Sequence, residues 1–281
     1  MLLIKKIIFS LVTFYSIFLP LESNANQFAK PTNKRIISLN SLGADIISKL
    51  DNDSLVGIPG SSLLKKSDIF SDKTIVSEGR MPPSLEKILK LRPTLVIGSE
   101  GFHDKILDKL NELEIETFKT NTKSINQLEI LIRDLATYLN KNPANLKENI
   151  KSCYLNKSKS RGTAVILAST KPLLSPNSNS WAGNLLDRFN FDNISKNLES
   201  KTEFKGYVNL SPEIILKTKP SKIILISFPG MNQNALLSDP ILQKVISTSK
   251  SEIINFNYYG LINPGNLKTI NKACEKLSNI L

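Results

Sequence analysis

Short β-branched hydrophobic runs alternate with amphipathic segments along most of the chain. The runs are typical of buried strands, and they lie at 35–39, 55–58, 75–76, 95–97, 164–167, 223–226 and 253–254. Between them, hydrophobic residues recur at helical spacing at 42–50, 85–91, 104–113, 124–138, 143–156, 181–189 and 264–277. Because a buried strand, a helix and a further buried strand make a parallel βα unit, we predict an α/β fold.

An internal repeat links the two halves of this pattern. Residues 79–93 align with residues 206–220 at a constant offset, and a β-branched run follows each copy. Ser84 and Ser211 stand where a hydroxyl caps the first free N–H groups of a helix. Both halves therefore carry one loop–helix–strand unit. We predict two Rossmann-like α/β lobes, at 34–141 and 161–281, joined by a single helix within 142–160.

The N-terminus has the organisation of a cleavable signal peptide. Lys5 and Lys6 precede an apolar run at 7–21, and small residues end at Ala25. The run contains polar residues and a proline, and it is shorter than the roughly 20 residues of a membrane-spanning helix. We predict that residues 1–25 are removed and that the mature chain is exported to the periplasm.

The formal net charge of +12 is strongly basic. Such a field attracts nucleic acid, anionic lipid or an anionic solute, but it does not specify a fold. The lysines are dispersed along the chain, and no nucleic-acid-binding motif accompanies them. We therefore interpret most of them as solvated surface and expect no nucleic-acid partner.

The chain contains few residues suited to catalysis or to metal binding. His103 is the only histidine, and neither a G-x-S-x-G elbow nor an H-E-x-x-H motif occurs. We expect no enzymatic activity, with an exported hydrolase as the alternative. One histidine cannot supply a zinc or manganese site, so we expect no resident metal and no cofactor. Bare Fe³⁺ held by tyrosines remains a second alternative.

Cys153 and Cys274 are the only cysteines. An oxidising compartment permits a disulfide between them, but two cysteines in a chain of this length do not make a disulfide scaffold. The sequence leaves their pairing open.

Taken in order and spacing, several stretches resemble the iron-siderophore and cobalamin family of periplasmic binding proteins. The matching stretches are 35–50, 83–97, 181–193 and 210–220. The resemblance implies two lobes bridged by one rigid helix, with the ligand in the cleft between them. It also implies a monomer that captures a small-molecule metal chelate and delivers it to the transmembrane subunits of an ABC importer. A ferric siderophore is our main hypothesis for the chelate, with cobalamin, another corrinoid or haem as the alternative.

The same resemblance assigns two residues to transporter docking. In the family, a surface glutamate on each lobe pairs with arginines of the importer, and Glu86 and Glu213 fall on those positions. Both also lie in the first turn of a predicted helix, where the helix dipole alone favours an acid.

Ligand contacts are expected from loops at the carboxyl ends of the strands. Arg80 occupies a position where siderophore-binding relatives carry an arginine that contacts the chelating oxygens, although a solvated surface arginine is the alternative. Phe102 matches a pocket aromatic of those relatives. The remaining candidates are aromatic residues that either contact a ligand or fill space at the cleft, namely Trp181, Tyr207, Tyr258 and Tyr259. Corrinoid binders of the family use several tryptophans, whereas this chain has one.

Overall fold

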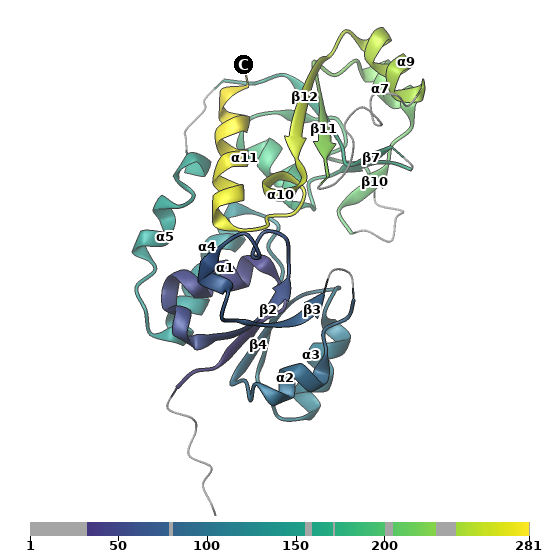
Figure 1. Ribbon diagram of the computed structural model, residues 1–281. Helices are drawn as coiled ribbons and strands as arrows, with labels where there is room; N and C mark the ends of the chain where they lie inside the picture. The colour runs from purple at the N-terminus through teal and green to yellow at the C-terminus, as the bar shows by residue number, and fades with distance from the viewer. Residues whose placement is uncertain are drawn as a thin grey trace, which may run out of the picture. The chain divides into compact units, whose positions relative to one another are not determined.

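The computed structural model describes residues 33–78, 81–154, 159–170, 172–199, 205–228 and 240–280. Within these residues the chain forms two α/β lobes, each built on a parallel sheet (Figure 1). The predicted signal peptide and Arg80 lie outside the described residues. No helix in the described part of the chain combines the length and the hydrophobicity needed to span a bilayer.

The first lobe is a five-stranded sheet in which all neighbouring strands are parallel. In sheet order the strands are β3 (Thr74–Glu78), β2 (Leu55–Gly60), β1 (Ile36–Ser38), β4 (Leu95–Ser99) and β5 (Thr117–Thr120). The helices that follow these strands are α1 (Ser41–Asp51), α2 (Leu85–Lys90) and α3 (Asp104–Glu112), with short 3-10 turns at Asn52–Ser54 and Asp68–Phe70. Ile36, Ile37 and Val96 are fully buried, as expected for central strands covered on both faces.

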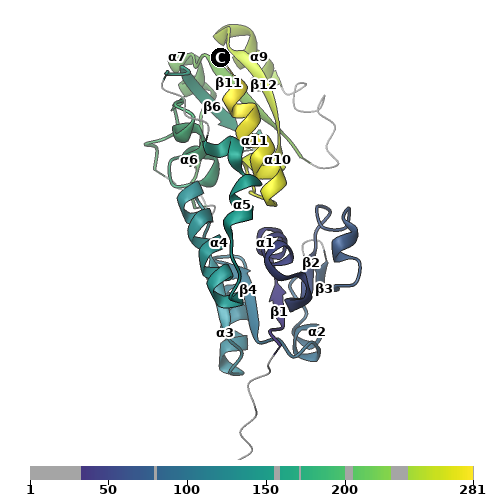
Figure 2. The same ribbon diagram turned by 90° about the vertical axis from the view of Figure 1, so that its left-hand side faces the viewer.

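The second lobe has a four-stranded parallel sheet and a small antiparallel one. The parallel sheet has the order β12 (Glu252–Asn257), β11 (Lys222–Ser227), β6 (Thr163–Leu167) and β9 (Asp192–Asn193). The antiparallel sheet has the order β10 (Tyr207–Asn209), β8 (Leu173–Pro176) and β7 (Ser169–Thr170). The helices are α6 (Trp181–Arg188), α7 (Pro212–Thr218), α9 (Pro240–Ser249), α10 (Tyr258–Leu261) and α11 (Leu267–Asn279). The last of these, α11, runs beside β12 in both views (Figures 1 and 2).

The segment between the lobes differs from the prediction. Helix α4 (Ile125–Leu139) ends at Asn140, whose φ of 54° is left-handed. The single helix expected at 143–156 is wrong, because only α5 (Ala144–Glu148) and the 3-10 turn η3 (Lys151–Tyr154) form. The Ser152 N–H donates to Asn271 Oδ1 at 2.9 Å, which removes a donor that a continuous helix would use. The proposed domain limits stay a prediction.

The repeat appears as two equivalent short helices, α2 and α7. Ser84 Oγ accepts a hydrogen bond from Lys87 N, as predicted, whereas the Ser211 side chain makes no capping bond to the backbone. In both copies a residue of left-handed backbone precedes the proline after the helix, Arg92 and Lys219, each with φ of 46°. Both lobes thus use one helix-ending geometry to lead into the next strand, β4 or β11.

Candidate functional site

A pocket of about 440 Å³ lies at the carboxyl ends of β11 and β12 in the second lobe. One lining residue, Leu63, comes from the loop after β2, so both lobes contribute to its wall. The other lining residues are Ser227, Phe228, Phe256, Asn257, Tyr258, Tyr259, Thr269, Lys272, Ala273 and Lys276. Because loops at the carboxyl edge of a parallel sheet are the usual place for a ligand, this pocket is the candidate site.

Three aromatic rings form a continuous wall of this pocket. The rings of Phe228 and Tyr258 are stacked, with centroids 5.0 Å apart and planes inclined by 30°. Tyr259 meets Tyr258 edge-on, at 5.2 Å and 71°. The wall therefore offers a rigid apolar surface with phenol groups, which suits a flat or conjugated ligand.

Two lysines of α11 complete the pocket. Lys276 Nζ lies 4.8 Å from the centroid of the Phe256 ring, and it also donates a hydrogen bond to the Asn255 carbonyl. Lys272 is exposed and lies one turn earlier on the same helix. Over the described residues the lining includes no aspartate or glutamate, so its charge is positive.

The loop that carries the tyrosines is fixed from behind by Trp181. This side chain is only 4% exposed, and its Nε1 donates to the Gly260 carbonyl at 2.8 Å. Gly260 has φ of 98°, and a Cβ there would stand 2.2 Å from the Thr269 carbonyl oxygen of α11. Trp181 is not among the lining residues, so the structure places this candidate behind the pocket wall.

Tyr207 lies on β10 and is partly buried. Burial, together with nearby Tyr258, raises the pKa of its phenol well above the ordinary value, so Tyr207 stays neutral. Tyr207 is not among the lining residues, whereas Tyr258 and Tyr259 are.

Phe102 lies in the loop after β4 of the first lobe, and its side chain is 85% exposed. The loop is fixed by His103, whose Nδ1 accepts a hydrogen bond from Ser99 N at 2.9 Å. Burial lowers the pKa of His103, although the adjacent Asp104 opposes the shift. Phe102 does not line the pocket in this structure, and its role in ligand binding stays a prediction.

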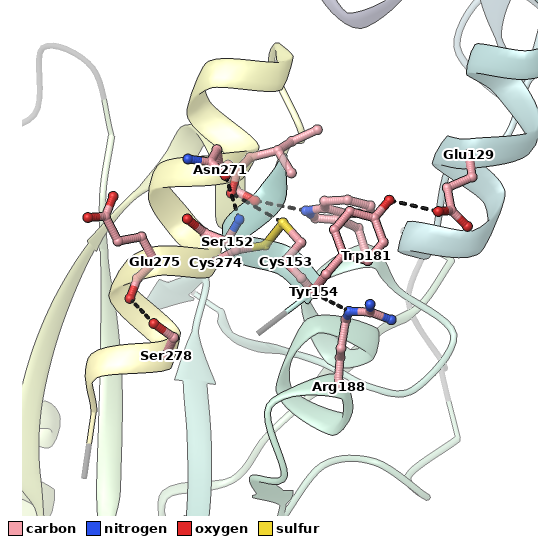
Figure 3. Close-up of a disulfide and its surroundings, with 12 residues drawn as sticks. Glu129, Ser152, Cys153, Tyr154, Trp181, Arg188, Asn271, Cys274, Glu275 and Ser278 are labelled. Atoms are coloured by element: carbon pink, nitrogen blue, oxygen red, sulfur yellow. Dashed lines mark hydrogen bonds between the residues drawn. A yellow bond between two sulfur atoms is a disulfide. The ribbon is translucent and has the colours of Figure 1, made fainter. Parts of the chain in front are cut away.

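Cys153 and Cys274 are joined in a disulfide, which answers the question that the sequence left open (Figure 3). Their Cα atoms are 4.9 Å apart, and both side chains are fully buried or nearly so. Arg188 Nε donates to the Cys153 carbonyl at 2.6 Å, so α6 also holds this segment. The disulfide ties the segment between the lobes to α11, the helix that carries the pocket lysines.

No group of three or more histidine, cysteine or acidic side chains among the described residues is arranged to hold a metal ion.

The family model for periplasmic binding proteins matches residues 36–254. The chain belongs to this family. No match was found among curated proteins.

Solved structures share the fold at low sequence identity. An ABC transporter substrate-binding protein from Listeria monocytogenes is 18% identical over 89% of this chain and 98% of its own, with a TM-score of 0.70. The periplasmic haem-binding protein RhuT from Roseiflexus is 20% identical over 88% of this chain and 100% of its own, with a TM-score of 0.66. The periplasmic vitamin B12 binding protein BtuF of Vibrio cholerae is 18% identical over 88% of this chain and 96% of its own, with a TM-score of 0.61.

The two candidate docking residues, Glu86 and Glu213, are both exposed in the first turns of α2 and α7. A hydrogen bond from its own backbone N–H, and another from the Ser211 hydroxyl, lower the pKa of Glu213. Its carboxylate is thus ionised at neutral pH. The docking roles of both glutamates stay predictions.

Proposed function

We propose that this protein is a periplasmic solute-binding protein that captures a metal chelate, with a ferric siderophore as the main candidate, and delivers it to an ABC importer. The observation that carries the proposal is the pocket at the carboxyl edge of the second-lobe sheet. Its aromatic wall of Phe228, Tyr258 and Tyr259 faces a helix that carries two lysines. Family membership supplies the solute-binding role, and these side chains suit a large chelate.

Haem and corrinoids are the alternative ligands within the same role. Relatives of the same fold are described as binding haem or vitamin B12, and both ligands are large and planar. The single tryptophan, Trp181, is used behind the pocket wall, which supports a ferric chelate over a corrinoid.

Export and delivery rest on two further features. The predicted signal peptide at 1–25 supports release into the periplasm. Glu86 and Glu213 stand exposed on equivalent helices of the two lobes, which supports docking to a pair of transmembrane subunits.

Fluorescence titration of the mature protein tests the ligand class. The Trp181 indole is bonded to Gly260, next to the pocket tyrosines, so ligand binding should change the emission of the only tryptophan. The titration uses a panel of ferric siderophores, haem and cobalamins. Iron-free siderophores are the controls that show whether binding requires the bound iron. We expect saturable quenching by a ferric chelate and a loss of binding in Arg80→Ala. Binding of cobalamin alone would assign the corrinoid alternative, and no binding across the panel would contradict the proposal.

A further inference from the structure

We propose that the pocket selects a metal chelate of net negative charge, and that Lys272 contacts the anionic oxygen atoms of this ligand. The inference rests on the function proposed above, and it specifies the ligand class of the same site.

The first support is the face that α11 turns toward the pocket. Thr269, Lys272, Ala273 and Lys276 all line it, and their spacing corresponds to one face of a helix. Two lysines four positions apart repel each other and destabilise a helix slightly. The acid between them in the sequence, Glu275, does not line the pocket, so an anion bound between or beside the two lysines would lessen their repulsion.

The second support is the difference between the two lysines. Lys276 is held by the Asn255 carbonyl and the Phe256 ring. In contrast, none of the ion pairs within the described part of the chain includes Lys272. Elsewhere exposed lysines do find acids, as Lys196 does with Asp192 at 2.8 Å. Lys272 is therefore the cation of the pocket that is placed to meet a ligand.

The third support is the combination of charge with the aromatic wall. A volume of about 440 Å³ lies within the range of small-molecule pockets. A ligand that stacks on Tyr258 and carries oxyanions toward Lys272 would use both surfaces at once. Catecholate-type ferric chelates and carboxylate-bearing chelates have this chemistry, whereas cyanocobalamin carries no net charge and should gain less from the lysines.

The test compares two lysine substitutions on α11 with matched ligands. Lys272→Gln removes one of the two pocket charges, and Lys268→Gln makes the same change at an exposed lysine of the same helix that does not line the pocket. Each protein is titrated with an anionic ferric tris-catecholate, a neutral ferric tris-hydroxamate and cyanocobalamin. Thermal unfolding of both variants checks that the fold is retained.

We expect the anionic chelate to bind most tightly and Lys272→Gln to weaken it about tenfold, the typical effect of losing one charge-assisted contact. Lys268→Gln should bind like the wild type, and added salt should reduce the affinity of the wild type more than that of Lys272→Gln. Equal binding of the neutral chelate, or wild-type affinity in Lys272→Gln, would overturn the inference while leaving chelate capture intact. Failure of every chelate to bind would overturn both.

Discussion

The carboxylate of Asp45 in α1 accepts a hydrogen bond from the backbone N–H of Leu267, the first residue of α11, at 2.9 Å. Asp45 is 5% exposed, and its other oxygen bonds Lys49 Nζ at 2.7 Å. An acid of the first lobe thus satisfies a free N–H at the start of a second-lobe helix, where the helix dipole also favours a negative charge. This contact fixes the end of α11 from which the pocket is built.

Loss of this contact should destabilise the protein. Asp45→Ala leaves the Leu267 N–H and Lys49 without their partner, so we expect the free energy of unfolding to fall by about 2 kcal/mol. Urea unfolding of the mature protein measures the change. Asp53→Ala is the matched control, since Asp53 is exposed on the same lobe. Equal losses in the two variants would show that the contact contributes no stability.

Gly260 should be intolerant of a side chain. A Cβ at this position would collide with the Thr269 carbonyl, so Gly260→Ala must push the tyrosine loop away from α11. We expect a loss of stability of about 2–4 kcal/mol and a clear drop in ligand affinity. Gly101→Ala controls for backbone strain, because Gly101 also has positive φ, at 81°, but no atom within 4 Å of the added Cβ. Ligand affinity in Gly260→Ala equal to that in Gly101→Ala would contradict the expectation.

The pattern of hydrophobic residues along the sequence made most of the fold predictable. Hydrophobic strands such as β1, β4, β6 and β11 and the helices α1, α4, α6 and α11 were found close to their expected limits, whereas α9 was not predicted. The sequence did not reveal β5, because Thr117–Thr120 is a polar edge strand, nor the antiparallel sheet, because its strands span only two to four residues. Such short elements are specified by their tertiary partners rather than by their own periodicity.

The site was predictable only in part. Tyr258 and Tyr259 follow a predicted strand, and the structure does place them in the pocket. Lys272 and Lys276 were not predicted as site residues, because lysines on the polar face of an amphipathic helix are usually exposed to solvent. Their four-residue spacing was the available signal, but only the packing of α11 against β12 turns this face toward a pocket.

Stability should decrease in mild acid because of His103. Burial lowers the pKa of this imidazole below the ordinary value of 6.5, since only the neutral ring can accept the Ser99 N–H. The stability that the neutral His103 ring contributes to the folded protein is therefore complete above pH 6.5. It is lost as the pH falls from there through the lowered folded-state pKa. Because the chain has one histidine, an NMR titration reads this pKa directly. A measured pKa at or above the ordinary value would contradict the prediction.

A comparison of urea unfolding at about pH 7.5 and about pH 5.5 measures the same effect on stability. His103→Gln is the control, since it cannot titrate in this range, and its stability should change less between the two conditions than that of the wild type.

Removal of the disulfide should have a large effect on stability. Cys153 and Cys274 are 121 positions apart, so the cross-link restricts a long stretch of the unfolded chain. We expect a double serine substitution, Cys153→Ser with Cys274→Ser, to lose about 2–5 kcal/mol in urea unfolding. The wild type treated with dithiothreitol should match the double variant, and a difference below about 1 kcal/mol would count against the expectation.

The docking glutamates should affect transport without affecting binding. A Glu86→Ala, Glu213→Ala double variant removes two exposed carboxylates that lie outside the pocket, so ligand affinity should remain at the wild-type value. Uptake through the importer should be lost, because both docking charges are absent. Glu112→Ala with Glu275→Ala is a control of equal charge change at other exposed positions. Normal uptake by the first variant would remove the docking assignment.

The position of α11 in the chain also bears on how fast the protein folds. Its contacts reach far back along the sequence, since Asp45 and Leu267 are 222 residues apart, and the cysteines are 121 apart. Contacts of such high sequence separation must overcome the entropy of closing long loops, which makes them slow to form. Docking of α11 is thus expected to be a late step in folding, and a chain that has folded both sheets but not yet docked this helix would lack the buried residues that α11 adds to the core and would have no binding site.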